Sequence, residues 1–174
     1  MTAYIALLRA VNVGGTGKLL MTELKRIGQE AGFANARTYL ASGNLLFECS
    51  ASEAAVKAAL EAGLEAYAGK PVGVLVRTAD EMAAVAAANP FPTAAPNRVV
   101  AIFLDDAPPA DALDHATGRR DEELRLGKRE LYVHYGEGIA DSKLRIPAAR
   151  DGTARNMNSV TRLAELAGAD RAGA

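Results

Sequence analysis

Short apolar runs alternate with stretches of helical spacing along the first half of the chain. Tyr4–Leu8 is long enough for a strand buried on both faces and too short for a helix. Leu24 and Ile27 instead fall on one face of a helix that Thr22 can cap. The expected elements are a strand, a helix, two strands, a helix and a strand, over Tyr4–Leu8, Thr22–Ala31, Arg37–Ala41, Leu45–Phe47, Ser52–Ala68 and Val72–Val76. This order predicts a ferredoxin-like unit.

The second half repeats most of this order. A helix over Ala79–Ala88 leads into residues 89–96, where three prolines in seven positions prevent a helix and stiffen a linker. A strand, a helix, two strands and a helix are then expected over Val99–Leu104, Pro109–Ala116, Glu123–Leu126, Glu130–Tyr135 and Asn158–Leu166. The pattern lacks the fourth strand of the first half.

The whole pattern predicts an α+β protein with two ferredoxin-like (βαββαβ) halves in tandem, the second incomplete, and a C-terminal helix. We expect a first subdomain over residues 1–77, a helix and proline-rich linker over 78–97, and a second subdomain with the C-terminal helix over 98–174.

Charge is distributed unevenly along the chain, although 20 basic against 21 acidic residues give a net charge of −1. Residues 1–47 carry +3, residues 78–123 carry −6 and residues 143–162 carry +4. Such segments are often solvated faces. A hydrophobic fraction of 49% excludes wholesale disorder, and no apolar run is long enough for a membrane helix. The single cysteine, Cys49, is typical of a protein in the reducing cytoplasm.

A glycine-rich segment, residues 12–18, follows the first strand. It fails the nucleotide-hydrolysing pattern, because Asn12 replaces the first glycine and Leu19 the metal-binding hydroxyl. It also lacks the third glycine of a dinucleotide-binding loop. Backbone N–H groups before a helix, with Arg9 and Lys18 nearby, can nevertheless hold an anion. The alternative is an ordinary loop.

Two further polar segments are candidates. In residues 153–161, Asn156 or Asn158 can cap the last helix, whereas Arg155 has a planar fork suited to phosphate or carboxylate. Capping accounts for one of these residues and leaves the others available for a ligand. The second segment, Ser42–Asn44, has the composition of a hairpin turn.

No metal, cofactor or catalytic constellation is expected. His115 and His134 have no neighbour at ligand spacing, and Cys49 has no base nearby in sequence. The third strand contains one aromatic residue, Phe47, and lacks the basic-glycine-aromatic pattern of RNA-recognition domains. An arginine-dominated basic face, with 14 Arg against 6 Lys, can still contact phosphates.

Four stretches together resemble a known family. They are Leu7–Gly15, then Met21 with Glu23 and Leu24, then Ser42–Asn44, and finally Ala154–Asn158. In order and spacing they resemble the domain of unknown function 1697 family, from Tyr4 to about Leu166. The resemblance implies a small, mostly bacterial α+β protein with ferredoxin-like subdomains, and it implies no reaction.

The polar segments coincide with these motif positions, which suggests one shared site. Its expected residues are Arg9, Asn12, Gly14, Gly15, Lys18, Asn44, Arg155, Asn156 and Asn158. The leading hypothesis is a binding module for an anionic or nucleotide-like ligand, nucleic acid included. One alternative is an enzyme acting on a small phosphorylated or carboxylated substrate, for which His134 would have to approach the site. The other is a structural protein that oligomerises through exposed sheet edges. No membrane partner is expected.

Overall fold

The chain divides into two compact units, each with its own sheet. The structure is a computed structural model that describes residues 1–9, 19–40, 42–136, 139 and 141–172. Unit 1 comprises Met1–Met82 and Leu163–Ala174, and unit 2 comprises Ala83–Arg162. The subdomain limits expected from the sequence stay a prediction.

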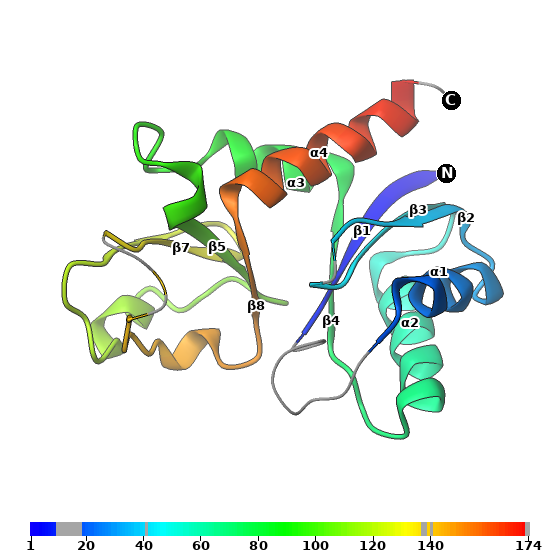
Figure 1. Ribbon diagram of the computed structural model, residues 1–174, viewed down its shortest axis with the longest axis horizontal. Helices are drawn as coiled ribbons and strands as arrows, with labels where there is room; N and C mark the ends of the chain where they lie inside the picture. The colour runs from blue at the N-terminus through cyan, green and yellow to red at the C-terminus, as the bar shows by residue number, and fades with distance from the viewer. Residues whose placement is uncertain (10–18, 41, 137–138, 140, 173–174) are drawn as a thin grey trace. The chain divides into compact units, whose positions relative to one another are not determined.

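Unit 1 has the predicted ferredoxin-like topology (Figure 1). Its elements are β1 (Thr2–Leu8), α1 (Met21–Glu30), β2 (Ala34–Thr38), β3 (Asn44–Cys49), α2 (Glu53–Ala68) and β4 (Val74–Thr78). The sheet is antiparallel with the strand order β2-β3-β1-β4, so the first strand lies inside the sheet. This position explains why the sequence of β1 is continuously apolar.

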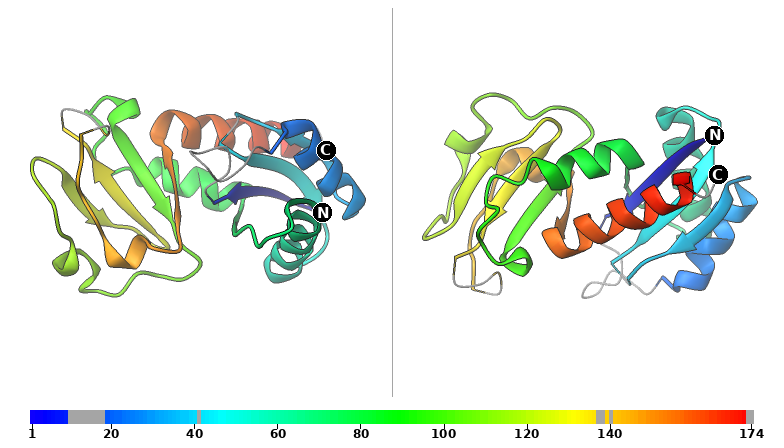
Figure 2. Two further views of the ribbon diagram at one scale, coloured as in Figure 1. Left: turned by 60° about the horizontal axis from the view of Figure 1, so that its bottom comes forward. Right: turned by 90° about the horizontal axis from the view of Figure 1, so that it is seen from above.

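Both faces of the unit 1 sheet are buried. Tyr4, Leu45 and Phe47 face a core shared with α1 and α2. Ile5 and Leu7 point to the opposite face and are fully buried. On that face the Arg37 guanidinium donates to the carbonyl of Leu166 at 2.9 Å, which holds the C-terminal half of α4 (Met157–Ala172) against the sheet (Figure 2).

The ends of the unit 1 elements follow local chemistry. Ser52 caps α2 by accepting from the Ala55 N–H at 3.2 Å, and Gly69 ends it with a positive φ of 74°, as predicted. The cap predicted at Thr22 is wrong, because α1 begins at Met21 after Leu20, which has no capping side chain. The second strand ends at Thr38 rather than residue 41, because Leu40 has a φ of 63° that a strand does not allow.

Unit 2 contains a second four-stranded antiparallel sheet. Helix α3 (Ala79–Ala87) spans the division between the units and leads into unit 2. The strands are β5 (Val99–Phe103), β6 (Glu123–Leu126), β7 (Glu130–His134) and β8 (Thr153–Asn156). Their order is β6-β7-β5-β8, the order of the unit 1 strands repeated. The predicted hairpin between β6 and β7 is confirmed.

The second half is incomplete in its helices. The fourth strand, missing from the sequence pattern, is present as β8. The helix expected over Pro109–Ala116 is wrong, because this segment forms only a 3₁₀ turn, η2 (Ala112–His115). The long segment between β7 and β8 contains a second short 3₁₀ turn, η3 (Pro147–Ala149). The turns η2 and η3 therefore stand where unit 1 has α1 and α2.

Both faces of the unit 2 sheet are also covered. Val100, Ile102 and Val133 belong to a core that includes partly buried residues of η2 and η3. On the other face the Tyr132 hydroxyl donates to the Val85 carbonyl of α3 at 2.9 Å. Burial raises the pKa of Tyr132 to about 12, so this hydroxyl remains a donor at any physiological pH.

Candidate functional site

The end of β1 is fixed between its two neighbours in unit 1. The Leu8 N–H donates to the carbonyl of Gly43 at 2.9 Å, and the Arg9 N–H donates to the carbonyl of Gly73 at 2.9 Å. These bonds hold the central strand to segments bordering β3 and β4 up to its last residue. Arg9 therefore leaves the sheet at a defined point.

The side chain of Arg9 lies against Gly73. A Cβ atom at position 73 would approach the Cδ of Arg9 to 2.9 Å, closer than side chains tolerate. A glycine at this position therefore lets the alkyl part of Arg9 lie on the backbone. Arg9 is partly buried, and its guanidinium lies at the end of the unit 1 sheet where the glycine-rich segment begins.

Asn44 is next to this point and is completely buried. It pairs with Leu7 across the β1–β3 ladder. Its amide nitrogen donates to the carbonyl of Tyr39 at 2.5 Å and to the Ser42 hydroxyl at 3.1 Å, which closes the turn between β2 and β3. Asn44 thus fixes the turn beside Arg9 and is oriented by the backbone rather than exposed to solvent.

The second group of predicted residues belongs to unit 2. Arg155 lies on β8 opposite Ala101 and is only 6% exposed. Its guanidinium donates to the Thr153 hydroxyl at 2.8 Å and to the Ala154 carbonyl at 2.9 Å. Burial lowers the pKa of Arg155 to about 10, which leaves the side chain charged at neutral pH.

The asparagines after β8 have separate positions. The side-chain oxygen of Asn156 accepts from the Ser159 N–H at 2.9 Å, the geometry of a helix cap at the start of α4. Asn158 lies in the first turn of α4 and is exposed. Of the two residues expected as the cap of the last helix, Asn156 or Asn158, the structure shows Asn156.

The structure places Arg9 and Asn44 at the same end of the unit 1 sheet, whereas in unit 2 Arg155 is buried, Asn156 caps α4 and Asn158 is exposed. Asn12, Gly14, Gly15 and Lys18 lie outside the described residues. One site shared by all nine residues stays a prediction. In the part of the chain that the structure describes, no three His, Cys, Asp or Glu side chains gather as metal ligands.

A polar cluster in unit 2 was missed by the sequence reasoning. Glu122 is 3% exposed, and its carboxylate accepts from the Ser142 hydroxyl and from the Arg120 N–H at 2.6 Å. The Arg119 Nε donates to the Glu122 carbonyl at 2.7 Å. Charged residues that precede a strand usually face water, so the sequence gives no sign that Glu122 is buried. The cluster is visible only in the structure, where the fold brings Ser142, 20 residues further along the chain, to Glu122.

Glu122 is expected to make stability depend on pH in the acid range. The Ser142 hydroxyl, followed by the Arg120 N–H, lowers its pKa below the ordinary value of about 4.3. Because the pKa is lower in the folded state, the ionised carboxylate contributes its full stabilisation at pH values above the ordinary pKa. This contribution is lost as the pH falls through the folded-state pKa. Urea unfolding of the wild type and Glu122→Gln should therefore differ most above pH 5. A difference that stays constant down to pH 3 would contradict this role.

These features define an α+β protein of two units, the first ferredoxin-like, with an arginine at the end of its central strand. Residues 1–132 match the family described as "Protein of unknown function (DUF1697)", and the chain belongs to that family. Among solved structures it is similar to conserved bacterial protein SP0830 from Streptococcus pneumoniae, with a TM-score of 0.79 and 22% identity, over 95% of this chain and 98% of that one.

The similarity to that structure concerns the fold alone. No curated protein matches the chain. Among the described residues, no helix combines the length and apolar character needed to cross a bilayer.

Proposed function

We propose that this protein is a binding module for a small anionic ligand that carries a phosphate or carboxylate group, such as a nucleotide. The site is centred on Arg9 at the end of β1, with Asn44 shaping the adjacent turn. The single observation that supports it is the fixed exit of Arg9 from the sheet between Gly43 and Gly73.

The chemistry of this position suits an anion. A guanidinium presents several N–H donors in one plane and matches phosphate or carboxylate oxygens in pairs. Figure 1 shows the end of β1 and the start of α1 at the same end of the unit 1 sheet. Helix α1 has no side-chain cap at Leu20, and a helix N-terminus favours negative charge. The sequence adds Asn12, Gly14, Gly15 and Lys18 to the proposed site.

A thermal-shift experiment on the full chain tests the proposal. The probes are inorganic phosphate, nucleoside mono- and triphosphates, sugar phosphates and dicarboxylates. A ligand at one hundred times its dissociation constant stabilises the folded state by about 2.7 kcal/mol. For a chain of this size we expect a rise in melting temperature of about 5–10 °C.

Arg9→Gln should abolish the shift, and Arg9→Lys should retain only part of it, because lysine keeps the charge without the planar fork. Lys25→Gln is the matched control, since Lys25 is an exposed cation of the same unit and its loss changes the net charge equally. The absence of a shift with every probe, or equal shifts in Arg9→Gln and wild type, would refute the proposal.

The residues of unit 2 are tested as a separate set. Arg155→Lys and Asn158→Ala change predicted ligand contacts, whereas Asn156→Ala also removes a helix cap and lowers stability by about 1 kcal/mol. We propose that Arg155 and Asn158 contribute to anion binding within unit 2. If both variants bind the probe as the wild type does, the ligand site is confined to unit 1.

A further inference from the structure

Two basic segments that are distant in sequence lie side by side in unit 2. The Thr117 N–H donates to the Arg145 carbonyl at 2.9 Å, and the Arg145 N–H donates back to the Thr117 carbonyl at 2.8 Å. This antiparallel pair joins residues 117–121 to residues 143–145. The acidic middle of the chain thus brings two of its three cations, Arg119 and Arg120, next to the basic C-terminal segment.

Two further interactions hold the segments together. Gly118 has a φ of 70°, and a Cβ atom there would overlap the carbonyl oxygen of Lys143. The backbones therefore meet more closely than any other residue would permit. Just beyond, the buried Glu122 carboxylate accepts from the Ser142 hydroxyl. The two segments are therefore joined at both ends of their contact.

The joined segments carry four exposed cations, Arg119, Arg120, Lys143 and Arg145, which we call the basic ridge. Within the described residues, Arg120, Lys143 and Arg145 form no ion pair. Two exposed acidic residues, Asp121 and Asp141, and the buried carboxylate of Glu122 accompany them, so the local balance is four positive charges against three negative, two of them exposed.

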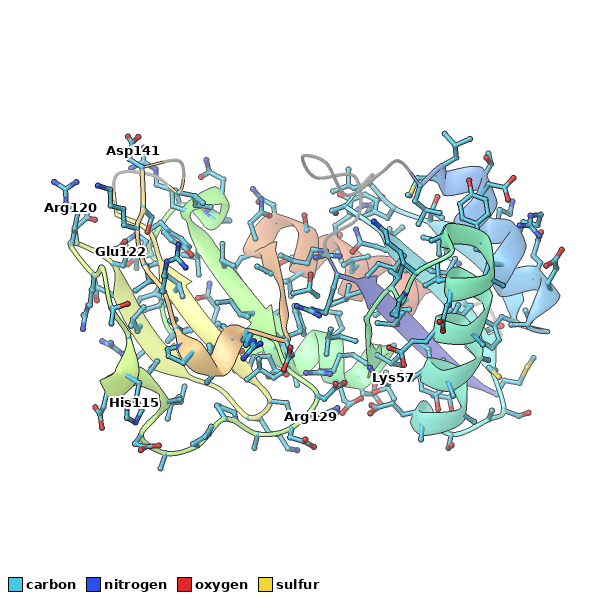
Figure 3. All side chains as sticks on the ribbon, turned by 90° about the horizontal axis from the view of Figure 1, so that it is seen from below. Lys57, His115, Arg120, Glu122, Arg129 and Asp141 are labelled. Carbon is cyan, nitrogen blue, oxygen red and sulfur yellow. The ribbon has the colours of Figure 1, made fainter. Side chains whose placement is uncertain are left out.

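The carboxylate of Glu122 is buried beneath the exposed charges of the ridge. Figure 3 shows Arg120 and Asp141 reaching outward, with Glu122 beneath them. Arg119 and Lys143 each lie two residues from the Thr117–Arg145 pair, so the contact between the segments holds like charges near one another. The backbone contact between the two segments therefore opposes the repulsion between their cations, and an anionic partner would offset that repulsion.

We propose that the basic ridge binds the phosphate backbone of a nucleic acid. Four cations on two neighbouring backbone segments suit a partner that repeats its negative charge, rather than a single phosphate group. Three of the four are arginines, whose guanidinium groups bind phosphate oxygens in pairs. The ridge contains no aromatic residue on which a base could stack, so its contacts are with the backbone and carry no sequence preference.

The basic ridge shares no residue with the small-ligand site proposed above. An Arg9→Gln variant should therefore keep its affinity for nucleic acid. Loss of one activity without the other separates the two proposals.

The test is fluorescence anisotropy of the full chain with a labelled single-stranded 20-mer in two unrelated sequences. If the four cations each neutralise one phosphate, the logarithm of the affinity falls with the logarithm of the salt concentration with a slope of about −2.8. Affinity should then drop about fifty-fold between 50 and 200 mM salt, equally for both sequences.

The variant Arg120→Gln with Lys143→Gln should bind about tenfold more weakly at 50 mM salt and halve the slope to about −1.4. Lys25→Gln with Lys128→Gln is the matched control, because it removes two exposed cations outside the ridge. Unchanged melting temperatures show that both double variants remain folded.

Three results would overturn the proposal. They are the absence of binding at 50 mM salt, a slope that the ridge variant does not change, and an equal loss in the control. Binding to vesicles of anionic phospholipid is measured in parallel. Binding to them without binding to the 20-mer would assign the ridge to a membrane surface instead.

Discussion

Phe47→Ala should lower the free energy of unfolding by about 4 kcal/mol, the usual cost of removing a buried phenylalanine side chain. Phe47 is 1% exposed and lies in the middle of β3. Its ring stacks on Phe33 with centroids 4.2 Å apart, and the ring of Tyr4 lies 5.8 Å away on the neighbouring strand. Alanine would leave a cavity that the buried rings of Tyr4 and Phe33 cannot fill.

Urea unfolding followed by far-UV circular dichroism measures this loss. Phe47→Leu is the control, because it keeps most of the buried volume and should cost about 1 kcal/mol. A loss below about 1 kcal/mol for Phe47→Ala would mean that this core repacks freely.

The unit 1 fold was predictable because its buried strands are made of apolar residues. Tyr4–Leu8 reads as a doubly buried strand, and every residue from Ala3 to Leu8 is indeed buried. Ser52 and Gly69 mark the ends of α2 through local hydrogen bonding and φ. Where a boundary was wrong, as at Leu40, the cause was a positive φ in a residue type that rarely adopts one.

Strand β8 escaped prediction because its inward positions are polar. Thr153 and Arg155 point into the unit 2 interior, whereas Ala154 is exposed, the reverse of the usual alternation. The guanidinium of Arg155 is accommodated by the Thr153 hydroxyl and a backbone carbonyl. Only the pairing with β5 makes this segment a strand, and such pairing is not visible in local sequence.

The candidate residues were predictable by type and not by role. Arg9 and Asn44 stand out as polar residues beside glycines, and the structure does bring them together at the end of the sheet. The role of Asn44 was not predictable, because its amide closes the turn by a hydrogen bond to Tyr39 that forms only in the folded hairpin. The basic ridge depends on a contact between residues 117 and 145. Because residue 117 lies in the acidic middle of the chain and residue 145 in the basic C-terminal segment, the charge distribution along the sequence does not predict that their cations lie together.

Gly118→Ala should destabilise the protein by about 3 kcal/mol, because alanine adds two costs at once. The first is the positive φ of 70°, which a side chain disfavours. The second is overlap of the new Cβ with the carbonyl oxygen of Lys143, a backbone atom held in place by the Thr117–Arg145 pair. Relief of that overlap requires the two segments to move apart.

Gly69→Ala separates the two costs. Gly69 has a nearly equal φ of 74°, and a Cβ there would meet no atom within 4 Å, so only the backbone cost of about 1 kcal/mol applies. Urea unfolding of both variants measures the difference, which we assign to the contact between Gly118 and Lys143. Because that contact also positions the basic ridge, Gly118→Ala should weaken binding to the 20-mer under conditions where the variant is folded, whereas Gly69→Ala should not. Equal losses of stability in the two variants would show that the segments separate without cost, and the ridge would then lack the rigidity on which its proposed function rests.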